Sequence, residues 1–494
     1  MAERPWHKRM PLQRAINLAF QRNNDPEHDG ADTIVAMSTA SGRGAIGIVR
    51  MSGPDALRIG ESAFRPARGF PVSQAETHCL LYGHVVSAVD GAVIDEALLA
   101  VMRSPRTYTR EDIVEIHCHG GLAAQREVLR EVIKLGARPA DPGEFTRRAF
   151  LNGRIDLTQA ESVASIVSAR SAGALRASVR QLEGGLSNKL RGLRKRLIRV
   201  LAQVEATVDF ADEDIEPVDW PTVSGELSEV IRELRLLLET AFLGRALEHG
   251  VRTAIVGRPN VGKSSLLNAL LMRERAIVSE IPGTTRDTVE ELVEIGGIPL
   301  HLVDTAGLRS GGDRVEQMGV ERSRKAMEEA DLVLAVFDLS KPWTPADLQL
   351  LSELDPARTI VVGNKLDLVD SPVSDQLGSQ LKATTSRDDW LHFSVSAVVG
   401  TGLDGLRALI QQNVTGEAGV HLDEPILANE RQRGLVEEAL VSAVAAMEGS
   451  QSAAYEELIC EDIRTSANAL GHVTGEDITP DLLEEIFGRF CIGK

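Results

Sequence analysis

The chain has 494 residues, of which 43% are hydrophobic and 26% charged, and it carries a formal net charge of −18. This length predicts roughly two to four domains with enough apolar residues for proper cores. No apolar run approaches the roughly 18 residues of a membrane span, so we expect no contact with a membrane. The acidic balance argues against broad, nonspecific nucleic-acid binding but leaves room for a local basic patch. The four cysteines are far apart and form no C-x-x-C pair, which predicts a reducing, cytoplasmic location.

Residues 1–31 are polar, and their second half is rich in Asn, Asp, Pro and Gly. We expect a disordered extension or a start codon placed too early. An Arg-rich transit peptide is the weaker alternative.

Residues 32–150 have the pattern of an α+β module. Strand-like runs cover residues 33–36, 45–51, 84–89, 92–102 and 112–117, and a helical pattern covers residues 122–135. The dipeptide Asp90-Gly91 separates the third and fourth runs and favours a hairpin with a type I′ turn. His117 and His119 would share a face of the last strand, but no third ligand is evident, so a metal site is the weaker interpretation.

A helical pattern begins near residue 151. Leucines spaced three and four residues apart predict one apolar stripe: Leu182, Leu186, Leu190, Leu193, Leu197 and Leu201. The same helix carries the basic residues Arg191, Arg194, Lys195, Arg196 and Arg199. A solvated face is the favoured interpretation of this charge run, and a patch for a phosphate backbone is the alternative. A second leucine-rich helix is predicted over residues 226–243.

Residues 257–264 read GRPNVGKS and fit the motif G-x-x-x-x-G-K-[ST], which is specific to phosphate-binding loops. A strand-like run, 251–256, precedes the motif and a helical pattern, 265–271, follows it. Backbone N–H groups of such a loop converge on phosphate oxygens. Lys263 would reach the β- and γ-phosphates, and the Ser264 hydroxyl would take Mg²⁺.

Three further motifs follow in order and indicate which nucleotide base is bound. Asp304-Thr-Ala-Gly307 would hold Mg²⁺ through water and sense the γ-phosphate. Asn364-Lys-Leu-Asp367 argues for GTP, because the Asp367 carboxylate can accept two N–H donors that guanine has and adenine lacks. Ser394-Val-Ser-Ala397 would contact the guanine carbonyl through its backbone.

Helical patterns resume at residues 429–447, 453–470 and 479–490. The sequence therefore predicts a multidomain α/β protein in which a Ras-like P-loop G domain, residues 249–416, is inserted between two halves of a helical domain, residues 151–248 and 417–494.

Four segments outside the nucleotide motifs carry a family resemblance: residues 42–53 (GRGAIGIVRMSG), 141–161 (DPGEFTRRAFLNGRIDLTQAE), 283–287 (GTTRD) and 491–494 (CIGK). Together they resemble the tRNA-modification GTPase family MnmE (TrmE) over about residues 32–494. One departure is Arg110, where the family often has glycine in T-G-E-D.

The resemblance implies a function and its partners. Family members form homodimers through the N-terminal domain and work with the flavin-dependent MnmG (GidA), which holds FAD, in a heterotetramer or larger complex. The pair adds a carboxymethylaminomethyl or aminomethyl group to carbon five of the wobble uridine of certain tRNAs. The one-carbon unit comes from 5-formyl- or methylene-tetrahydrofolate. The implied folate contacts here are Arg50, Glu115, Arg154 and Lys494.

The resemblance also implies how GTP is hydrolysed. Leu308 follows the D-x-x-G glycine and cannot orient water, so Glu316 is the implied catalytic residue. A K⁺ ion would take the place of an arginine finger. Its implied ligands are Asn260, Ser279, Ile281 and Thr284, and those of Mg²⁺ are Ser264 and Thr285. The residues expected at the nucleotide are Asn260, Val261, Gly262, Lys263, Ser264, Ser265, Ser279, Glu280, Ile281, Pro282, Gly283, Thr284, Thr285, Asp304, Thr305, Ala306, Gly307, Asn364, Lys365, Asp367, Ser396 and Ala397.

Two other functions remain open from the sequence. A ribosome-assembly GTPase of the Era or Der type would need an RNA-binding module or a second G domain, and neither is visible in the sequence. A purely structural, self-associating GTPase would leave the folate-type residues without a purpose. For Cys491, a packing thiol is at least as good an interpretation as a nucleophile, because no basic partner can be assigned to it.

Overall fold

The computed structural model describes residues 32–40, 42–209, 218–273, 290–304, 325–369, 374–385, 387–415, 424–452, 455–476 and 478–494. The chain divides into two compact units, residues 1–164 with 474–494, and residues 165–473. The predicted fold class is confirmed, because an α+β sheet, a helical bundle and a P-loop sheet are all present. The predicted domain boundaries at residues 150, 248 and 416 stay predictions.

The first unit is built on a seven-stranded sheet with the order β3-β4-β5-β6-β2-β1-β7. Its strands are β1 (Ile34–Met37), β2 (Ile46–Ser52), β3 (Phe64–Pro66), β4 (Cys79–Val86), β5 (Val93–Met102), β6 (Ile113–His119) and β7 (Arg138–Pro139). Neighbours are antiparallel except β1 and β7. Met51, Leu99 and Ile116 lie in one core with α2 (Ala56–Ala63) and α3 (Leu122–Lys134). Since strand side chains alternate, the residues between them face the other side of the sheet.

The predicted hairpin is confirmed, but its turn is not the predicted type I′. That turn needs positive φ at both central residues, and of Asp90 and Gly91 only Gly91 (φ 69°) has it. Instead, β4 and β5 are joined by the longer loop 87–92. Its ends are closed by two backbone bonds, Gly91 N–H to Ser87 O (2.8 Å) and Ser87 N–H to Ala92 O (2.9 Å).

Near the C-terminus the unit is completed by α4 (Glu144–Leu151), the start of α5 (Leu157–Ser168) and α17 (Pro480–Gly488). The sequence places this last helix in the second half of the helical domain, residues 417–494. Its apolar side, continued by Phe490, contacts Ile155 and Ala160 of the predicted first half of that domain and also Ala149 of α4. The last helix therefore contacts residues on both sides of the predicted domain boundary at residue 150.

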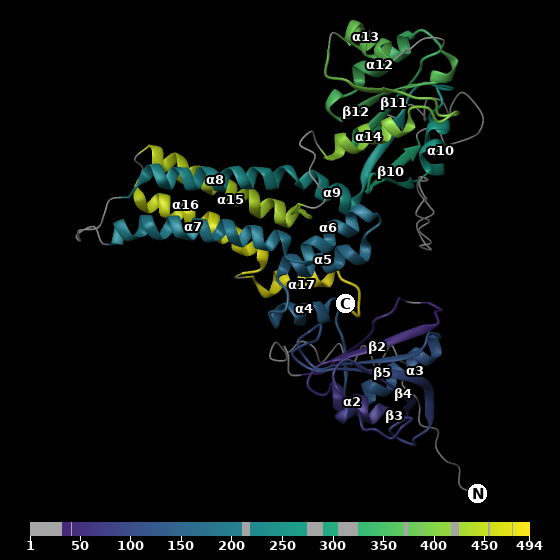
Figure 1. Ribbon diagram of the computed structural model, residues 1–494, viewed down its shortest axis with the longest axis vertical. Coiled ribbons are helices and arrows are strands. Elements are labelled where there is room, and N and C mark those ends of the chain that lie inside the picture. The colour runs from purple at the N-terminus through teal and green to yellow at the C-terminus, as the bar shows by residue number, and fades with distance from the viewer. Residues whose placement is uncertain are drawn as a thin grey trace. The chain divides into compact units, whose positions relative to one another are not determined.

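The second unit contains a bundle of long helices: α7 (Gly185–Asp209), α8 (Trp220–Glu239), α15 (Glu430–Gln451) and α16 (Glu456–Thr474). Figure 1 shows them side by side. The predicted leucine stripe is confirmed in α7, where Leu201 is half-buried and four further leucines are buried: Leu186, Leu190, Leu193 and Leu197. Leu182 lies on a separate helix, α6 (Ala172–Leu182).

The basic residues of α7 fall into two groups. Arg196 pairs with Glu226 (3.1 Å) and Glu233 (3.2 Å) of α8, and Arg194 donates from Nε to Ala467 O (3.2 Å). These two arginines therefore join helices of the bundle. Arg191, Lys195 and Arg199 are exposed. The choice between a solvated face and a phosphate patch stays open for this second group.

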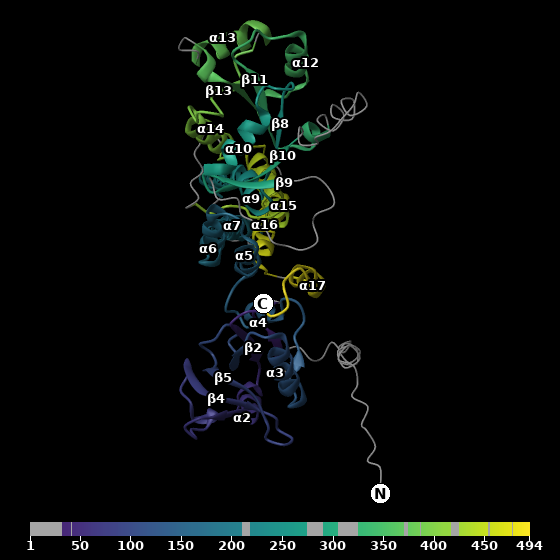
Figure 2. The ribbon, with the colours of Figure 1, turned by 90° about the vertical axis from the view of Figure 1, so that its right-hand side faces the viewer.

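The rest of the second unit is a six-stranded sheet with the order β13-β12-β11-β8-β10-β9. Its strands are β8 (Val251–Val256), β9 (Glu290–Ile295), β10 (Ile298–Asp304), β11 (Leu332–Asp338), β12 (Thr359–Asn364) and β13 (Leu391–Ser394). All neighbours are parallel except β9 and β10. One face is covered by α10 (Lys263–Arg273) and α14 (Leu403–Thr415), the other by α12 (Pro345–Glu353) and α13 (Ser374–Thr385). In Figure 1, α12 and α13 lie above β11 and β12, and α14 lies below these two strands. Figure 2 shows the same part of the chain from the side, with α12 and α13 again at the top.

Two helices of the helical part share a core with this sheet. Ala174 of α6 and Leu243 of α9 (Ala241–His249) lie in one buried cluster with Val293 and Leu300 of β9 and β10. At the N-terminus of α6 the backbones meet so closely that a Cβ on Gly173 would lie 2.2 Å from Gly297 O. The β9–β10 hairpin therefore rests directly on α6.

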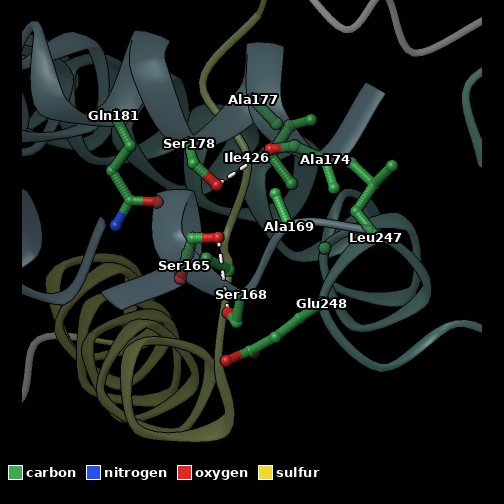
Figure 3. Close-up of a pocket in the computed structure, with 12 residues that line it drawn as sticks. Ser165, Ser168, Ala169, Ala174, Ala177, Ser178, Gln181, Leu247, Glu248 and Ile426 are labelled. Carbon is green, nitrogen blue, oxygen red and sulfur yellow. Dashed lines mark hydrogen bonds between the residues drawn. The ribbon is translucent and has the colours of Figure 1, made fainter. Parts of the chain in front are cut away.

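Figure 3 shows a small pocket beside this junction. It is lined by residues of α5, α6 and α9, among them Ser168, Ala174 and Leu247, together with Ile426. No predicted site residue is among its lining residues, so the pocket is separate from the sites described below.

Candidate functional site

The glycine-rich loop of residues 257–264 has the geometry that its motif requires. Gly257 (φ 146°) and Gly262 (φ 101°) adopt backbone angles that favour glycine. A Cβ on Gly257 would lie 2.3 Å from Val336 O, and one on Gly262 would lie 2.1 Å from Asn364 Nδ2. Both glycines are therefore needed for space as well as for conformation.

Lys263 lies at the end of the motif and begins α10. Its Nζ donates to Gly257 O (2.8 Å) and to Arg258 O (2.9 Å), so the ammonium lies across the loop. Val261 is buried, whereas Ser264 and Ser265 are exposed in the first turn of α10. A helix N-terminus next to a lysine and two hydroxyls suits an anion.

Asn364 joins the predicted motifs into one site. It ends β12, is buried, donates from Nδ2 to Val261 O (2.9 Å) and accepts at Oδ1 from Ala397 N–H (3.0 Å). It thereby ties the glycine-rich loop to the segment 394–397. All these groups follow the carboxyl ends of parallel strands, where α/β sheets place their ligands.

The residues expected to recognise the base lie next to Asn364. Ser396 Oγ donates to Asp367 Oδ1 (2.5 Å), which orients the exposed carboxylate of Asp367. Lys365 Nζ donates to Asn260 O (2.8 Å) and pairs with Asp338 Oδ2 (2.7 Å). The structure thus brings Asn260, Asp367 and Lys365 together around one edge of the sheet.

Several predicted residues lie outside the described part of the chain: Ser279, Glu280, Ile281, Pro282, Gly283, Thr284, Thr285, Thr305, Ala306, Gly307 and Glu316. The backbone of Asp304 ends β10, beside Ile255 of β8, but its side chain is not described. The roles predicted for these residues stay predictions.

Sequence reasoning missed two acidic residues of this site. Asp347 is buried, accepts from Arg258 Nε of the glycine-rich loop (2.7 Å) and completes a capping box with Thr344 at the start of α12. The spacing of Thr344 and Asp347 is that of a capping box and could have revealed this role. Asp338, the partner of Lys365, ends an apolar strand, and no motif marks it.

A second polar cluster lies on the first unit's sheet, on the face away from α2 and α3. Arg50 Nε of β2 pairs with Glu115 Oε1 of β6 (2.7 Å), and His117 Nε2 lies 3.1 Å from Glu115 Oε2. Burial alone would raise the pKa of Glu115, but Arg50 and His117 outweigh it and hold that pKa below its ordinary value. Glu115 is therefore an oriented, ionised acceptor.

Aromatic residues connect Arg50 with Arg154. The Arg50 guanidinium lies 5.8 Å from the centre of the Phe145 ring, and that of Arg154 lies 4.7 Å from the centre of the Tyr108 ring. Tyr108 packs against the small core that contains Phe145. Arg154 is thus linked to the Arg50–Glu115 pair through ring contacts on α4 and the loop before β6.

The C-terminal tail reaches the same sheet. Gly493 (φ 96°) lies so close that a Cβ on it would be 2.2 Å from Met37 O, and Cys491 O accepts from Gly143 N–H (3.5 Å). Met37 follows Ala36, which pairs with Arg50 across β1 and β2. Lys494 therefore ends the chain beside these strands, its N–H donating to Cys491 O (3.2 Å).

Arg110 adopts the left-handed backbone conformation (φ 59°) that a glycine would take without cost. A non-glycine residue there costs about 1–2 kcal/mol. Arg110 Nη1 donates to Asn152 O (2.7 Å), and Asn152 Nδ2 donates to Thr109 O (2.6 Å). These two bonds hold the loop against the end of α4, so the arginine preserves a turn suited to glycine.

The two histidines weighed as metal ligands each pair with a carboxylate. His117 faces Glu115, and His119 Nδ1 lies 2.7 Å from Asp95 Oδ1.

Across the described part of the chain, no helix is both long and apolar enough to cross a membrane.

Comparisons with known proteins match nearly the whole chain. A family model described as the MnmE helical domain matches residues 157–491, and one described as the GTP-binding protein TrmE N-terminus matches residues 33–154. The tRNA modification GTPase MnmE of Moorella thermoacetica is 45% identical over 464 residues, which cover 94% of this chain and 99% of that protein. The MnmE proteins of Streptococcus gordonii and Desulforamulus reducens are 44% and 41% identical, with the same coverage.

Solved structures match a smaller part. A crystal structure of Aquifex aeolicus Era bound to GDP and AlF4⁻ is 28% identical over 38% of this chain and 65% of that chain, with a TM-score of 0.27.

Proposed function

The chain belongs to the MnmE family of tRNA modification GTPases, and we propose that it is a potassium-activated member that acts with a flavin-dependent MnmG partner. The pair would add a carboxymethylaminomethyl or aminomethyl group to carbon five of the wobble uridine of certain tRNAs, with a tetrahydrofolate as one-carbon donor. The observation that carries the GTPase part is Asn364, whose side chain joins the phosphate loop to the segment at the base.

GTP would lie along the carboxyl edge of the sheet. The Lys263 ammonium and the N–H groups that open α10 would hold the phosphates, and Asp367 would accept the N–H donors of guanine. The exposed hydroxyl of Ser264 suits Mg²⁺, with Thr285 and, through water, Asp304 completing the set. Mg²⁺ would neutralise charge on the β- and γ-phosphates.

A K⁺ ion would take the place of an arginine finger. Asn260 fits this role because its side chain is exposed within the phosphate loop and its backbone is held in the left-handed conformation (φ 65°). Carbonyl and hydroxyl oxygens of Ser279, Ile281 and Thr284 would complete the set. The ion would offset the negative charge that develops as the γ-phosphate is transferred. Glu316 would orient the attacking water through a second water.

The cluster on the first unit's sheet would bind the folate. Glu115 would accept N–H donors of the pterin ring, while Arg154 and the Lys494 ammonium would face the carboxylates of the glutamate tail.

Apolar Leu80, Tyr82 and Leu98 are exposed on the same face of this sheet. An exposed apolar strip of this kind supports the proposal that two copies pair through this module. The same proposal includes a homodimer that joins MnmG in a heterotetramer or larger complex. It also includes a cytoplasmic location.

The GTPase proposal is tested by comparing hydrolysis in Na⁺ and K⁺ at equal ionic strength. Hydrolysis should be much faster in K⁺, and Asn260→Ala should lose this response while keeping its affinity for GDP. Glu316→Ala should lower the K⁺-stimulated rate by roughly 10²-fold, the scale of lost general-base work. Equal rates of the wild-type protein in both salts would contradict potassium activation.

The folate proposal has its own test. 5-Formyl-tetrahydrofolate binding, measured by calorimetry, should be lost in Glu115→Gln, because the variant presents one acceptor and one donor to the pterin in place of two acceptors. Exposed Glu76→Gln on the same module is the matched control and should bind as the wild type does. Unchanged binding by Glu115→Gln would remove this residue from the site.

A further inference from the structure

Asp338 is a buried acidic residue next to the nucleotide motifs, and its role is not explained by those motifs. It ends β11, and its side chain is 4% exposed. Oδ2 accepts from Lys365 Nζ (2.7 Å), and Oδ1 accepts from Ser340 N–H (3.0 Å) and Ser340 Oγ (2.6 Å). Both carboxylate oxygens are therefore held in a fixed direction, one of them toward Lys365.

Lys365 connects Asp338 to the phosphate loop. The same ammonium that pairs with Asp338 donates to Asn260 O (2.8 Å). Lys365 (φ 67°) and Asn260 (φ 65°) both hold the left-handed conformation, which is unfavourable for residues with a side chain. The ammonium thus joins the Asp338 carboxylate to the carbonyl of Asn260 and stabilises the orientation of the Asn260 peptide.

We propose that Asp338 is a positioning residue for the cation site: through Lys365 it fixes the backbone of Asn260 and so directs the Asn260 amide oxygen toward K⁺. This inference rests on the proposed function, which makes Asn260 a K⁺ ligand. In this arrangement one acidic residue links the base-recognition motif to the cation that acts at the phosphates.

The negative charge of Asp338 is essential to this role. Burial alone would raise the pKa of Asp338, but the bonds from Lys365 and Ser340 outweigh it and hold that pKa below its ordinary value, so the residue is ionised at neutral pH. Hydrogen bonds between ionised groups are about twice as strong as neutral ones. In Asp338→Asn the ammonium would lose its counter-charge and turn toward water, which releases Asn260 O. The cation site would weaken although Asn260 itself is unchanged.

The test measures K⁺ affinity separately from nucleotide affinity in the full-length chain. The half-activating K⁺ concentration comes from GTPase titrations. A second readout is the rise in melting temperature that K⁺ causes over Na⁺ with GDP and AlF4⁻ bound. In Asp338→Asn the half-activating concentration should rise roughly tenfold, which corresponds to about 1.4 kcal/mol, or one charge-assisted bond. The K⁺-dependent rise in melting temperature should shrink in parallel.

Two further variants keep the test decisive. Ser340→Ala removes one of the bonds that orient the Asp338 carboxylate, and because Ser340 is exposed the variant is expected to fold. It should shift the half-activating concentration in the same direction by a smaller factor. Asp388→Asn breaks the exposed Lys382–Asp388 pair of the same module and should change nothing.

The outcomes separate this inference from the proposed function. If the wild-type protein responds to K⁺ but both Asp338→Asn and Ser340→Ala keep its half-activating concentration, Asp338 does not position the site. If Asp338→Asn does not fold, an unchanged value in Ser340→Ala alone overturns the inference. If the wild-type protein shows no K⁺ response, the potassium site itself is wrong, and the inference is overturned with it. A faster release of fluorescent GDP in Na⁺ with unchanged K⁺ affinity would make Asp338 a support of the base pocket only.

Discussion

The nucleotide site and the polar cluster of the first unit are built in different ways. Around the nucleotide site, short segments at one sheet edge meet through groups such as Val261 O and Ala397 N–H, which both bond to Asn364. In the first unit, Arg50 and Glu115 come from separate strands, and the tail reaches the sheet from the other end of the chain. A site made of local loops and backbone groups leaves a motif in the sequence. A site made of side chains that tertiary packing brings together leaves none, and here only the family resemblance indicated it.

The largest effect is expected from removing the C-terminal tail, which belongs to the first unit and not to the nucleotide motifs. Deleting Cys491 to Lys494 removes the close contact of Gly493 with Met37 O and the terminal lysine beside β1. We expect wobble-uridine modification in a complemented deletion strain to be lost, measured by mass spectrometry of tRNA nucleosides. The K⁺-stimulated GTPase rate of the purified variant should stay within about a factor of three of the wild type.

Two results would break the comparison between the sites. A truncated protein that still modifies tRNA would remove the tail from the folate cluster. A truncated protein that also loses GTPase activity would show that the tail supports the second unit, so that the two sites are not independent.

The same contrast explains how much of the protein could be predicted. The turn between β8 and α10 was predicted correctly, because the motif that holds Gly257 and Gly262 encodes a backbone conformation within eight residues. Strands β1, β2, β5, β6 and β8 were found from their apolar runs, whereas β3, β7 and β11 were not predicted. The predicted Asp90-Gly91 turn was wrong, because the turn type depends on the register of both strands. Asp338 was missed, because its partner Lys365 lies 27 residues away, directly after the neighbouring strand β12.

The buried arginine of the first unit provides the next test. Arg148 is 6% exposed and pairs with Asp32 (2.6 Å), Glu144 (3.0 Å) and Glu111 (3.2 Å). Arg148→Met keeps most of the volume but leaves Asp32 and Glu144 with Arg138 as their remaining arginine partner and removes the ion pair of Glu111. Breaking a buried ion network from one side costs about 3–5 kcal/mol. Urea unfolding of the variant should show a loss of this size. Arg58→Met, which breaks an exposed pair with Asp55, is the matched control and should show no resolvable loss.

The pH dependence of this loss follows from the carboxylates. Burial alone would raise the pKa values of Asp32 and Glu144, but Arg138 and, to a smaller degree, Arg148 outweigh it and hold both pKa values below the ordinary range. A carboxylate with a lowered folded pKa contributes stability that is present above its unfolded pKa of about 4 and is lost as pH falls through the folded pKa. The stability difference between wild type and Arg148→Met should therefore shrink below about pH 4. A difference that stays constant to pH 3 would mean that the loss comes from packing and not from charge.

The smallest effect is expected for the exposed pair of His119 and Asp95, which marks the other limit of ion pairing in the first unit. His119 is 69% exposed, and its hydrogen bond to Asp95 raises its pKa above the ordinary value. A histidine with a raised folded pKa contributes stability below its unfolded pKa of about 6.5, and this is lost as pH rises through the folded pKa. An NMR titration should place the His119 midpoint above that of a free histidine, and Asp95→Asn should lower it toward about 6.5. Because water screens so exposed a pair, the variant should unfold at nearly the wild-type urea concentration. A large loss of stability on this substitution would show that β5 and β6 depend on the bond from His119 N–H to the Asp95 carboxylate (2.8 Å). That bond involves a backbone group, as do the bonds that join the segments of the nucleotide site.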